Sequence, residues 1–373
     1  MLADDADVSF VPMNDLGELV KYFEPKEVRK FAEVVKSYTY FADGDVLCAK
    51  ITPCFENGKL GIASNLESGA GFGSSEFVVM RPKPALSAGF LYYYLSRDAF
   101  REAGARVMSG AVGHKRVPRE YFEDLPIPLP PLNGQKRIVA VLDQAFAALD
   151  RARAHAEANL ADAETLLEAI KFDVFDRSDS IARRVTLAEV TSIDSTLVDP
   201  RDPEFLDMPH LGAGNMISGS DALVDVMTAR QEKLKSGKYQ FDDTMILYSK
   251  IRPYLRKVVR PDFSGVCSAD VYPLSPSAEL DRDFLFHILH TKDFTEYAIS
   301  GSDRAGMPKV NREHLFKYEF GLPPIAAQRE AASKIDRAMG AVDGLKAVLK
   351  SKLTDIANLR QSLLQKAFSG ELT

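Results

Sequence analysis

The chain has 373 residues, of which 46% are hydrophobic and 27% charged, and a formal net charge of −6. This length and apolar content suffice for two ordinary hydrophobic cores. The three cysteines show no CxxC spacing, which excludes a disulfide framework and suits a reducing compartment. No apolar run approaches the roughly 18 residues that span a bilayer, and the acidic N-terminus is unlike a signal peptide. We therefore expect a soluble cytoplasmic protein with no membrane contact.

The first predicted domain contains a strand, a helix and a basic stretch, in that order. The apolar run Val46-Leu47 predicts a strand that ends just before Lys50-Ile51-Thr52-Pro53. Apolar residues from Phe90 to Phe100 have helical spacing. Residues 101–119 then hold five Lys or Arg against one acid, a local charge of +4. Such a stretch could neutralise phosphates, although charge clusters are more often solvated faces.

A long helix is predicted after the double proline at Pro130-Pro131, because no further proline follows for over 40 residues. Its apolar residues alternate in steps of four and three, which is typical of a helix that pairs with another helix. From about Gly134 to Val174 it would be roughly 60 Å long at 1.5 Å per residue, so it could act as a spacer.

The second half of the chain repeats the first. Lys250-Ile251-Arg252-Pro253 follows the apolar run Ile246-Leu247, and Phe284 to Phe294 again has helical spacing. Cys267-Ser268-Ala269-Asp270 corresponds to Gly73-Ser74-Ser75-Glu76. Residues 228–260 form a second basic stretch, with nine Lys or Arg against three acids, a local charge of +6. Two domains that share a scaffold but differ in their loop residues are suited to binding two different partners.

A second long helix follows Pro323-Pro324, and each of its motif residues lies 193 positions after its counterpart (322 − 129 = 193). Duplicated halves predict pseudo-twofold symmetry and an antiparallel pair of helices. Asn159 and Lys352 then fall near the mid-point of the apolar seam. They could form a polar layer that fixes the register, or they could be solvated positions on an imperfect stripe.

No catalytic signature appears in the sequence. His287 and His290 lack the HExxH context of a zinc site, and the glycines of residues 69–73 and 110–115 lack the spacing of nucleotide-binding loops. The methyltransferase Asn-Pro-Pro-aromatic motif and a nuclease carboxylate-lysine set are also missing. We therefore expect a protein that is not an enzyme and holds no metal or cofactor.

Two motifs carry a resemblance to a known family: residues 129–139, after the first domain, and residues 359–372, at the end of the chain. Through them the chain closely resembles the specificity subunit of type I restriction-modification systems. Residues 50–59 and 71–77 are also similar to segments of that family's target-recognition domains. The resemblance covers essentially the whole chain and implies an α/β (α+β) fold. Two target-recognition domains would be separated by two long helices that form an antiparallel coiled coil.

The resemblance also assigns a role to each segment. It implies target-recognition domains at residues 1–124 and 178–317, and spacer helices at residues 125–177 and 318–373. Each domain would read one half-site of a bipartite double-stranded DNA target, and the helices would set the gap. Two methylation subunits and the restriction-translocase subunits would dock on this scaffold. S-adenosylmethionine, ATP and Mg²⁺ are expected only on those partners.

The expected DNA-binding residues are basic or small polar residues of the two loop regions. The resemblance suggests Lys50 and Lys250 at strand ends and Lys115, Arg116 and Lys309 in loops. The full set of candidates is Lys50, Thr52, Lys59, Ser74, Arg106, Lys115, Arg116, Lys235, Lys238, Lys250, Arg252, Arg256, Lys257, Arg304 and Lys309. Basic residues contact phosphates more often than bases. The alternative is a coiled-coil adaptor of a related defence complex, whose domains bind protein and whose basic stretches are solvated.

One segment of the second domain has no counterpart in the first. Val185-Thr186-Leu187 opens the second domain well before Met208-Pro209, whereas only ten residues precede Val11-Pro12-Met13. The first domain could lack its opening strand through a late start or a deletion, or could complete itself with the C-terminal segment.

Overall fold

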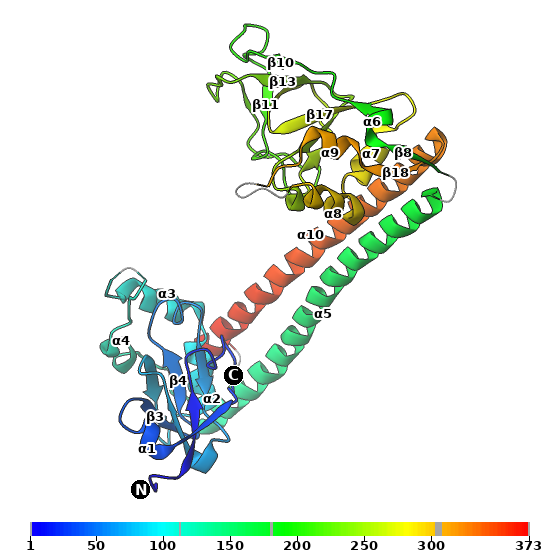
Figure 1. The fold of residues 1–373 in the computed structure, drawn as a ribbon. Helices are drawn as coiled ribbons and strands as arrows, with labels where there is room; N and C mark the ends of the chain where they lie inside the picture. Colours follow the sequence, from blue (N-terminus) through cyan, green and yellow to red (C-terminus); the bar gives the residue numbers. More distant parts are fainter. Residues whose placement is uncertain (1, 112, 180–181, 303–307, 372–373) are drawn as a thin grey trace. The chain divides into compact units, whose positions relative to one another are not determined.

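The structure, a computed structural model, describes residues 2–111, 113–179, 182–302 and 308–371. The chain forms two compact units, Met1–Asn159 with Val348–Thr373 (unit 1) and Leu160–Ala347 (unit 2). Each unit contains one α/β domain and part of each long helix (Figure 1). These helices are α5 (Leu132–Asp179) and α10 (Ile325–Ser369), which confirms both predicted helices.

The two long helices pair antiparallel within each unit. In unit 1, Arg360 late in α10 contacts Asp150 early in α5, with 2.8 Å between Nη1 and Oδ1. In unit 2, Lys346 lies 2.9 Å from Glu164, and Lys334 lies 3.6 Å from Asp173. Residues further along α5 thus meet residues earlier in α10, as predicted from the repeat.

The predicted apolar seam holds at some positions of the long helices and fails at others. Leu142, Ile335 and Leu349 are buried as expected. Leu166, Leu345 and Leu359 were expected in the seam but are 57%, 45% and 48% exposed. A straight helix with 3.6 residues per turn drifts by about 20° per heptad against a 3.5-residue repeat, so one stripe cannot stay in the interface throughout.

Asn159 and Lys352 line one hollow of about 350 Å³ in unit 1. Both side chains are exposed, and no hydrogen bond joins them in the described part of the chain. Of the two interpretations open from the sequence, solvated positions on an imperfect stripe fit this geometry.

The domain of unit 1 has two small sheets, ordered β2-β1-β6-β3 and β5-β4-β7. The strands are β1 (Asp7–Val11), β2 (Glu27–Lys30), β3 (Thr39–Ala42), β4 (Val46–Ala49), β5 (Leu60–Ile62), β6 (Ala70–Gly73) and β7 (Phe77–Met80). The helices are α1 (Phe31–Val34), the 3-10 turn η1 (Glu67–Gly69), α2 (Ala88–Leu95), α3 (Asp98–Val107) and α4 (Arg119–Glu123). The predicted strand at Val46-Leu47 is β4.

The domain of unit 2 repeats this plan with more strands, ordered β10-β13-β16-β11-β12, β15-β14-β17-β9 and β18-β8. The strands are β8 (Arg183–Thr186), β9 (Thr191–Ser192), β10 (Leu197–Val198), β11 (Pro209–Leu211), β12 (Met227–Thr228), β13 (Lys238–Phe241), β14 (Ile246–Ser249), β15 (Val258–Val259), β16 (Gly265–Ser268), β17 (Val271–Pro276) and β18 (Glu319–Leu322). The helices are α6 (Leu187–Val190), η2 (Pro253–Leu255), α7 (Arg282–Ile288), α8 (Lys292–Ser300) and α9 (Arg312–Phe316).

Each domain has a parallel strand pair in the middle of its first sheet, β1 with β6 and β11 with β16. A ring from the next strand packs on a glycine of this pair. A Cβ on Gly71 would lie 2.2 Å from the Phe41 ring, and a Cβ on Gly265 would lie 2.8 Å from the Phe241 ring. Only glycine fits at either position without displacing the ring.

Each domain core includes the ends of both long helices. In unit 1, Ile138 and Leu142 of α5 and Leu364 of α10 are buried with the domain residues. In unit 2, Val174 of α5 and Ile335 of α10 are buried in the same way. Burying apolar surface is the main stabilising contribution to a fold, so each domain is built onto both helices.

A buried glutamine joins each domain to the start of the helix that follows it. Gln135 Oε1 accepts from the N–H of Ser87 at 2.9 Å, and its Nε2 donates to the carbonyls of Ala85 and Pro130. Gln328 Oε1 accepts from the N–H of Asp281 at 2.7 Å. Its Nε2 donates to the matching carbonyls, of Glu279 and Pro323. Both glutamines are 0% exposed. The repeated sequence around Gln135 and Gln328 therefore forms the same domain–helix contact in each unit, which we call the joint.

The opening segment of unit 2 forms β8, which pairs with β18. Unit 1 has no strand at residues 126–129, the counterpart of β18, in the part of the chain that the structure describes. Gly370 and Glu371 form a turn back onto Lys366, and the last two residues lie outside the described residues. Completion by the C-terminal segment is therefore not seen among the described residues.

Candidate nucleic-acid interface

In unit 1, predicted DNA-binding residues from distant parts of the sequence meet at the end of β4. Lys50 Nζ donates to the carbonyl of Ser75 at 3.0 Å. Arg116 donates to both carboxylate oxygens of Glu76, with distances from 2.6 to 3.1 Å. Lys50, Thr52, Lys115 and Arg116 are here called the first basic cluster.

Backbone hydrogen bonds hold the three loops of this cluster together. The N–H of Lys50 donates to the carbonyl of Glu76 at 3.0 Å, and that of Val117 donates to the carbonyl of Lys50 at 2.8 Å. The N–H of Thr52 donates to the carbonyl of Lys115 at 3.0 Å. The side chains are therefore presented from a fixed frame.

Unit 2 repeats this frame bond for bond. The N–H of Lys250 donates to the carbonyl of Asp270 at 3.0 Å, that of Val310 to Lys250 at 2.8 Å, and that of Arg252 to Pro308 at 2.9 Å. Lys250 Nζ donates to the carbonyl of Ala269 at 2.6 Å, and Lys309 Nζ donates to Asp270 Oδ1 at 3.1 Å. Lys250, Arg252 and Lys309 are here called the second basic cluster.

A carboxylate lies between the cations of each cluster. In the first, the hydrogen bonds from Arg116 lower the pKa of Glu76, against the opposing effect of burial. In the second, Asp270 lies within 3.5 Å of Lys250 and 3.1 Å of Lys309. Each cluster thus holds three cations against one carboxylate, which leaves it with a net positive charge.

Several other predicted residues are exposed on the same domains. Lys115, Lys235 and Arg252 are exposed, and Arg106 is exposed with only a 3.7 Å ion pair to Glu102. Arg256 is half-buried. The hydroxyls of Ser74 and Thr52 are already engaged: Ser74 Oγ accepts from the N–H of Glu76, and Thr52 Oγ1 donates to Glu56.

Three predicted lysines are used inside the fold. Lys59 Nζ donates to the carbonyls of Met13 and Leu16, and Lys257 Nζ donates to the carbonyl of Ala213. Lys238 is only 5% exposed, and its Nζ donates to Ser236, while burial lowers its pKa. Lys238 therefore has little surface to offer DNA, because its position in β13 buries the side chain in the domain. Arg304 lies outside the described residues.

Sequence reasoning missed the two carboxylates and an exposed ring. Glu76 and Asp270 occupy matching positions of the repeat, and that match was the available signal. Tyr254 is 53% exposed between Arg252 and Arg256, whose φ angles are +49° and +47°. Non-glycine residues in this left-handed region cost roughly 1 kcal/mol or more each, and such strain is concentrated at functional sites.

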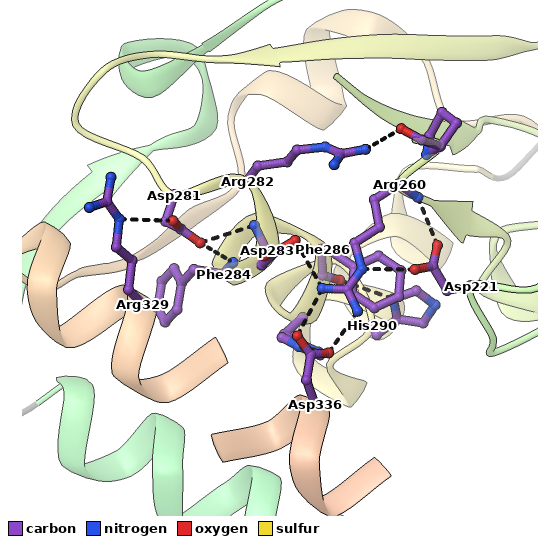
Figure 2. Close-up of polar contacts among 12 residues, drawn as sticks. Asp221, Arg260, Asp281, Arg282, Asp283, Phe284, Phe286, His290, Arg329 and Asp336 are labelled. Atoms are coloured by element: carbon purple, nitrogen blue, oxygen red, sulfur yellow. Dashed lines mark hydrogen bonds and ion pairs between the residues drawn. The ribbon is translucent and has the colours of Figure 1, made fainter. Parts of the chain in front are cut away.

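A separate polar network joins the domain of unit 2 to α10. Figure 2 shows the guanidinium of Arg260 between the carboxylates of Asp221, Asp283 and Asp336. The distances from Arg260 are 2.8, 2.9 and 2.7 Å, and its side chain is 17% exposed. His287 Nε2 lies 3.0 Å from the same Asp336.

The charges of this network are fixed by its hydrogen bonds. Burial opposes ionisation of Asp336, but the bonds from His287 and Arg260 outweigh it and hold the pKa of this carboxyl well below its usual range. In unit 1 the equivalent carboxylate, Asp143, accepts from Lys21 Nζ at 2.5 Å and from the Tyr93 hydroxyl. Both networks attach a domain to a long helix, and this structural role accounts for the clustering of their charged residues.

Comparison with known proteins identifies the family. The family described as "Type I restriction modification DNA specificity domain" matches residues 2–157 and 186–355, most of both units. The chain belongs to this family. Its curated relatives include the type I restriction enzyme EcoEI specificity subunit of Escherichia coli, 34% identical over 52% of this chain and 33% of that subunit. The EcoDI specificity subunit of Escherichia coli is 34% identical over 50% of this chain and 41% of that subunit. The matched stretch thus spans less than half of each of these relatives.

Solved structures share the fold. A chain from a structure on assembly and conformational transition of the type I R-M system aligns over 99% of this chain and 93% of its own length, with a TM-score of 0.77 and 18% identity. The HsdS subunit from Thermoanaerobacter tengcongensis aligns over 99% and 92%, with a TM-score of 0.64 and 18% identity. The predicted arrangement of two α/β domains with two long helices is confirmed.

No helix in the described part of the chain combines the length and apolar character that crossing a bilayer requires.

Proposed function

We propose that this chain is the non-catalytic DNA-specificity subunit of a type I restriction-modification complex and that it acts in the cytoplasm. It reads a bipartite double-stranded target, one half-site per domain. The observation that carries the proposal is the duplication of the basic cluster. Lys50 and Lys250 follow matching strands, and Arg116 and Lys309 complete matching frames. The two equivalent cationic sites suit the DNA backbone, which is the same at both half-sites. The different loops around them suit the two different half-site sequences.

The frame supports base reading as well as phosphate contact. Lysine and arginine neutralise phosphates and can donate to guanine O6 and N7, whereas a carboxylate can accept from a cytosine amino group. Glu76 and Asp270 are 23% and 39% exposed, so they are accessible beside their cations. Each domain thus offers donors and an acceptor from one rigid set of loops.

The long helices supply surfaces for partner subunits. Seven large apolar side chains on them are exposed in the part of the chain that the structure describes. They are Leu132 at 40%, Val141 at 45%, Leu166 at 57%, Phe172 at 74%, Leu345 at 45%, Val348 at 52% and Leu359 at 48%. Contiguous exposed apolar patches mark protein interfaces, and Leu345 and Val348 lie one helical turn apart in α10. In our proposal two methylation subunits dock there, one per repeat, and the restriction subunits join them. S-adenosylmethionine, ATP and Mg²⁺ then act on those partners.

The test is methylation mapping of host DNA with and without this gene, with the methylation subunits present. A single bipartite motif should be methylated only when the chain is expressed. A native mass of the purified complex should correspond to two methylation subunits per chain. An unchanged methylation pattern would contradict the DNA-reading role, and a stable one-to-one complex at saturation would contradict the symmetric scaffold.

Salt dependence separates this function from that of a protein-binding adaptor. DNA binding through several phosphates should weaken steeply from 50 to 200 mM salt, on the order of a thousandfold for six contacts. Binding of a protein through apolar surface should change little over the same range.

A further inference from the structure

In unit 2, residues 250–257 connect β14 to β15 and are here called the β14–β15 loop. The two strands pair antiparallel. The N–H of Ser249 donates to the carbonyl of Lys257 at 3.0 Å, and this hydrogen bond closes the base of the loop. The loop begins with Lys250 and contains Arg252, so it carries two of the three cations of the second basic cluster.

Contacts with other segments of the domain fix this loop in place. The carbonyl of Arg256 accepts from the N–H of Gly219 at 3.1 Å, and Lys257 Nζ donates to the carbonyl of Ala213 at 2.5 Å. The backbone frame of the second basic cluster holds its other end. A loop that is ordered before it binds a ligand loses little conformational entropy on binding. The β14–β15 loop is therefore suited to recognition.

The turn η2 within this loop leaves the ring of Tyr254 in solvent. The N–H groups of Leu255 and Arg256 donate to the carbonyls of Arg252 and Pro253, each at 2.9 Å. Arg252 and Arg256 both have left-handed backbone. Tyr254 between them is 53% exposed, and its hydroxyl has no hydrogen-bond partner among the described residues. Left-handed backbone is unfavourable for a residue with a side chain, and burial of this ring does not offset that cost.

Arg252 and Arg256 have no carboxylate partner in the described part of the chain. Other arginines of the same domain do have one. Arg201, Arg230 and Arg260 lie 2.6, 2.8 and 2.7 Å from aspartate oxygens. The two unpaired guanidinium groups leave positive charge on both sides of Tyr254 in the chain. Phosphate oxygens are the anionic acceptors that such groups bind on DNA.

The matching loop of unit 1 has a similar frame and different side chains. The offset between Lys50 and Lys250 is 200 residues, and it places Thr52, Cys54 and Glu56 where unit 2 has the two arginines and the ring. Thr52 Oγ1 donates to Glu56 Oε1 at 2.9 Å, so these two side chains bind each other. Cys54 is half-buried. In this loop, an exposed ring between two cations is therefore a feature of unit 2 and not of unit 1.

A ring in this setting fits one apolar feature of duplex DNA. The base faces are stacked on one another, and the apolar group that the major-groove edge presents is the C5-methyl of thymine. Phosphate contacts position a protein on DNA without carrying sequence information. A tyrosine side chain also loses little entropy when it binds. Two arginines and a ring on one fixed loop thus combine phosphate contacts with a base contact that they place.

We propose that Tyr254 is a specificity-determining residue whose ring packs on a thymine methyl group in the half-site of unit 2. Arg252 and Arg256 bind phosphates beside that thymine. This inference rests on the proposed DNA-reading function and names a side chain that reads a base. Unit 1 reads its half-site without an equivalent ring in this loop, so the two half-sites differ in how they are recognised.

The first test measures binding of the full chain, in complex with methylation subunits, to a labelled duplex that carries the methylated motif. Tyr254→Ala should weaken binding roughly tenfold and relax the preference at one base pair of one half-site. Tyr254→Phe keeps the ring and should bind as the original chain does. Tyr22→Ala removes an equally exposed ring from unit 1, also at 53%, and is the matched control. Equal losses for Tyr254→Phe and Tyr254→Ala, or the same loss on every sequence, would overturn the proposal.

The second test removes the methyl group from the DNA. Deoxyuridine replaces thymidine at each position of the same half-site in turn, which deletes only the C5-methyl. One replacement should weaken binding of the original chain about fourfold. In Tyr254→Ala the same replacement should have no further effect, because the ring that contacts the methyl group is absent. A full additional loss in the variant, or a half-site without an A·T pair, would contradict the contact.

Failure of this inference is distinguishable from failure of the proposed function. If the original complex methylates no motif, the chain does not read DNA and both proposals fail. If the original complex methylates a bipartite motif and Tyr254→Ala changes neither the motif nor the affinity, the DNA-reading function stands and the role of Tyr254 is refuted.

Discussion

Unit 1 and unit 2 use an aspartate at the same position of their long helices, but they give it different partners. Asp336 is held by Arg260 and His287, whereas Asp143 is held by Lys21 and Tyr93. The buried glutamine of each helix, by contrast, makes the same three hydrogen bonds in both units. The helix side of each joint is thus duplicated, while the domain side varies around it.

This difference indicates how one scaffold can present two domains. The side chain of the helix glutamine makes the same hydrogen bonds to backbone groups in both units, and these bonds set where the domain attaches. A cation that differs between the units, Lys21 or Arg260, adds an ion pair to the helix aspartate. The loops that we propose read DNA can then change without changing the joint. The following experiments test whether the two units are equivalent where their contacts match and different where they do not.

The largest effect is expected from lengthening both helices while leaving both joints intact. Seven residues inserted after Ala156 and seven after Leu349 keep the seam in phase and add about 10 Å of helix. If the helices set the gap, the half-sites should keep their sequences while their separation grows by roughly three base pairs of about 3.4 Å. Methylation mapping measures this. Three base pairs also rotate one half-site about the DNA axis, so activity should fall. A folded variant that methylates the original spacing equally well would contradict the spacer role.

Replacing either buried glutamine should cost the most stability. Gln328→Ala leaves the N–H of Asp281 and the carbonyls of Glu279 and Pro323 without this partner, which should destabilise unit 2 by roughly 3 kcal/mol. Gln135→Ala should destabilise unit 1 by a similar amount. Hydrogen exchange resolved for each unit measures both effects. Gln365→Ala, an exposed position of α10, is the control and should change neither unit. Clearly unequal losses would show that the joints are not equivalent.

Replacing the helix aspartate should destabilise unit 2 more than unit 1. Asp336→Asn should destabilise unit 2 by about 2 kcal/mol, because Arg260 then loses a partner while only 17% exposed. Asp143→Asn should cost about 1 kcal/mol, because Asp143 is 45% exposed. Denaturant unfolding at pH 7 measures both losses, and equal values would mean that the cation's identity is unimportant.

The Asp336 effect should also depend on pH in a defined direction. The pKa of Asp336 is lower in the folded state than its unfolded value of about 3.9. Its carboxylate therefore stabilises the fold above that value, and the contribution is lost as the pH falls through the folded pKa. The difference between the original chain and Asp336→Asn should accordingly shrink below about pH 4. A difference that stays constant from pH 7 to pH 2 would exclude this linkage.

Single lysines of the basic clusters should affect DNA binding and leave the stability of both units unchanged. Lys250→Ala should weaken DNA binding by about 1.5 kcal/mol, and Lys50→Ala should do the same. A base contact would relax the preference in one half-site only, whereas a phosphate contact would lower the salt slope by about one for all sequences. Lys317→Ala, in an exposed pair with Glu313, is the control. No change in affinity, specificity or salt slope would remove both lysines from the interface.

Local patterns in the sequence were sufficient for the elements and for the duplication. The double prolines and the helical spacing predict α5 and α10, and the apolar runs at Val46 and Ile246 predict β4 and β14. These features could be predicted because they depend on neighbours within one helix or strand. The matching of Glu76 with Asp270 was also visible in the repeat, but a carboxylate in a basic region did not look like part of the site.

The sequence determined the two halves, their long helices and the antiparallel pairing that their symmetry implies. It could not determine which basic residues are free, because Lys238 and Lys115 look alike until the fold buries one in β13 and exposes the other. Nor could it find the pairing of Arg260 with Asp336, 76 residues apart. Only the tertiary structure decided these, since burial and charge pairing depend on segments brought together from distant parts of the chain.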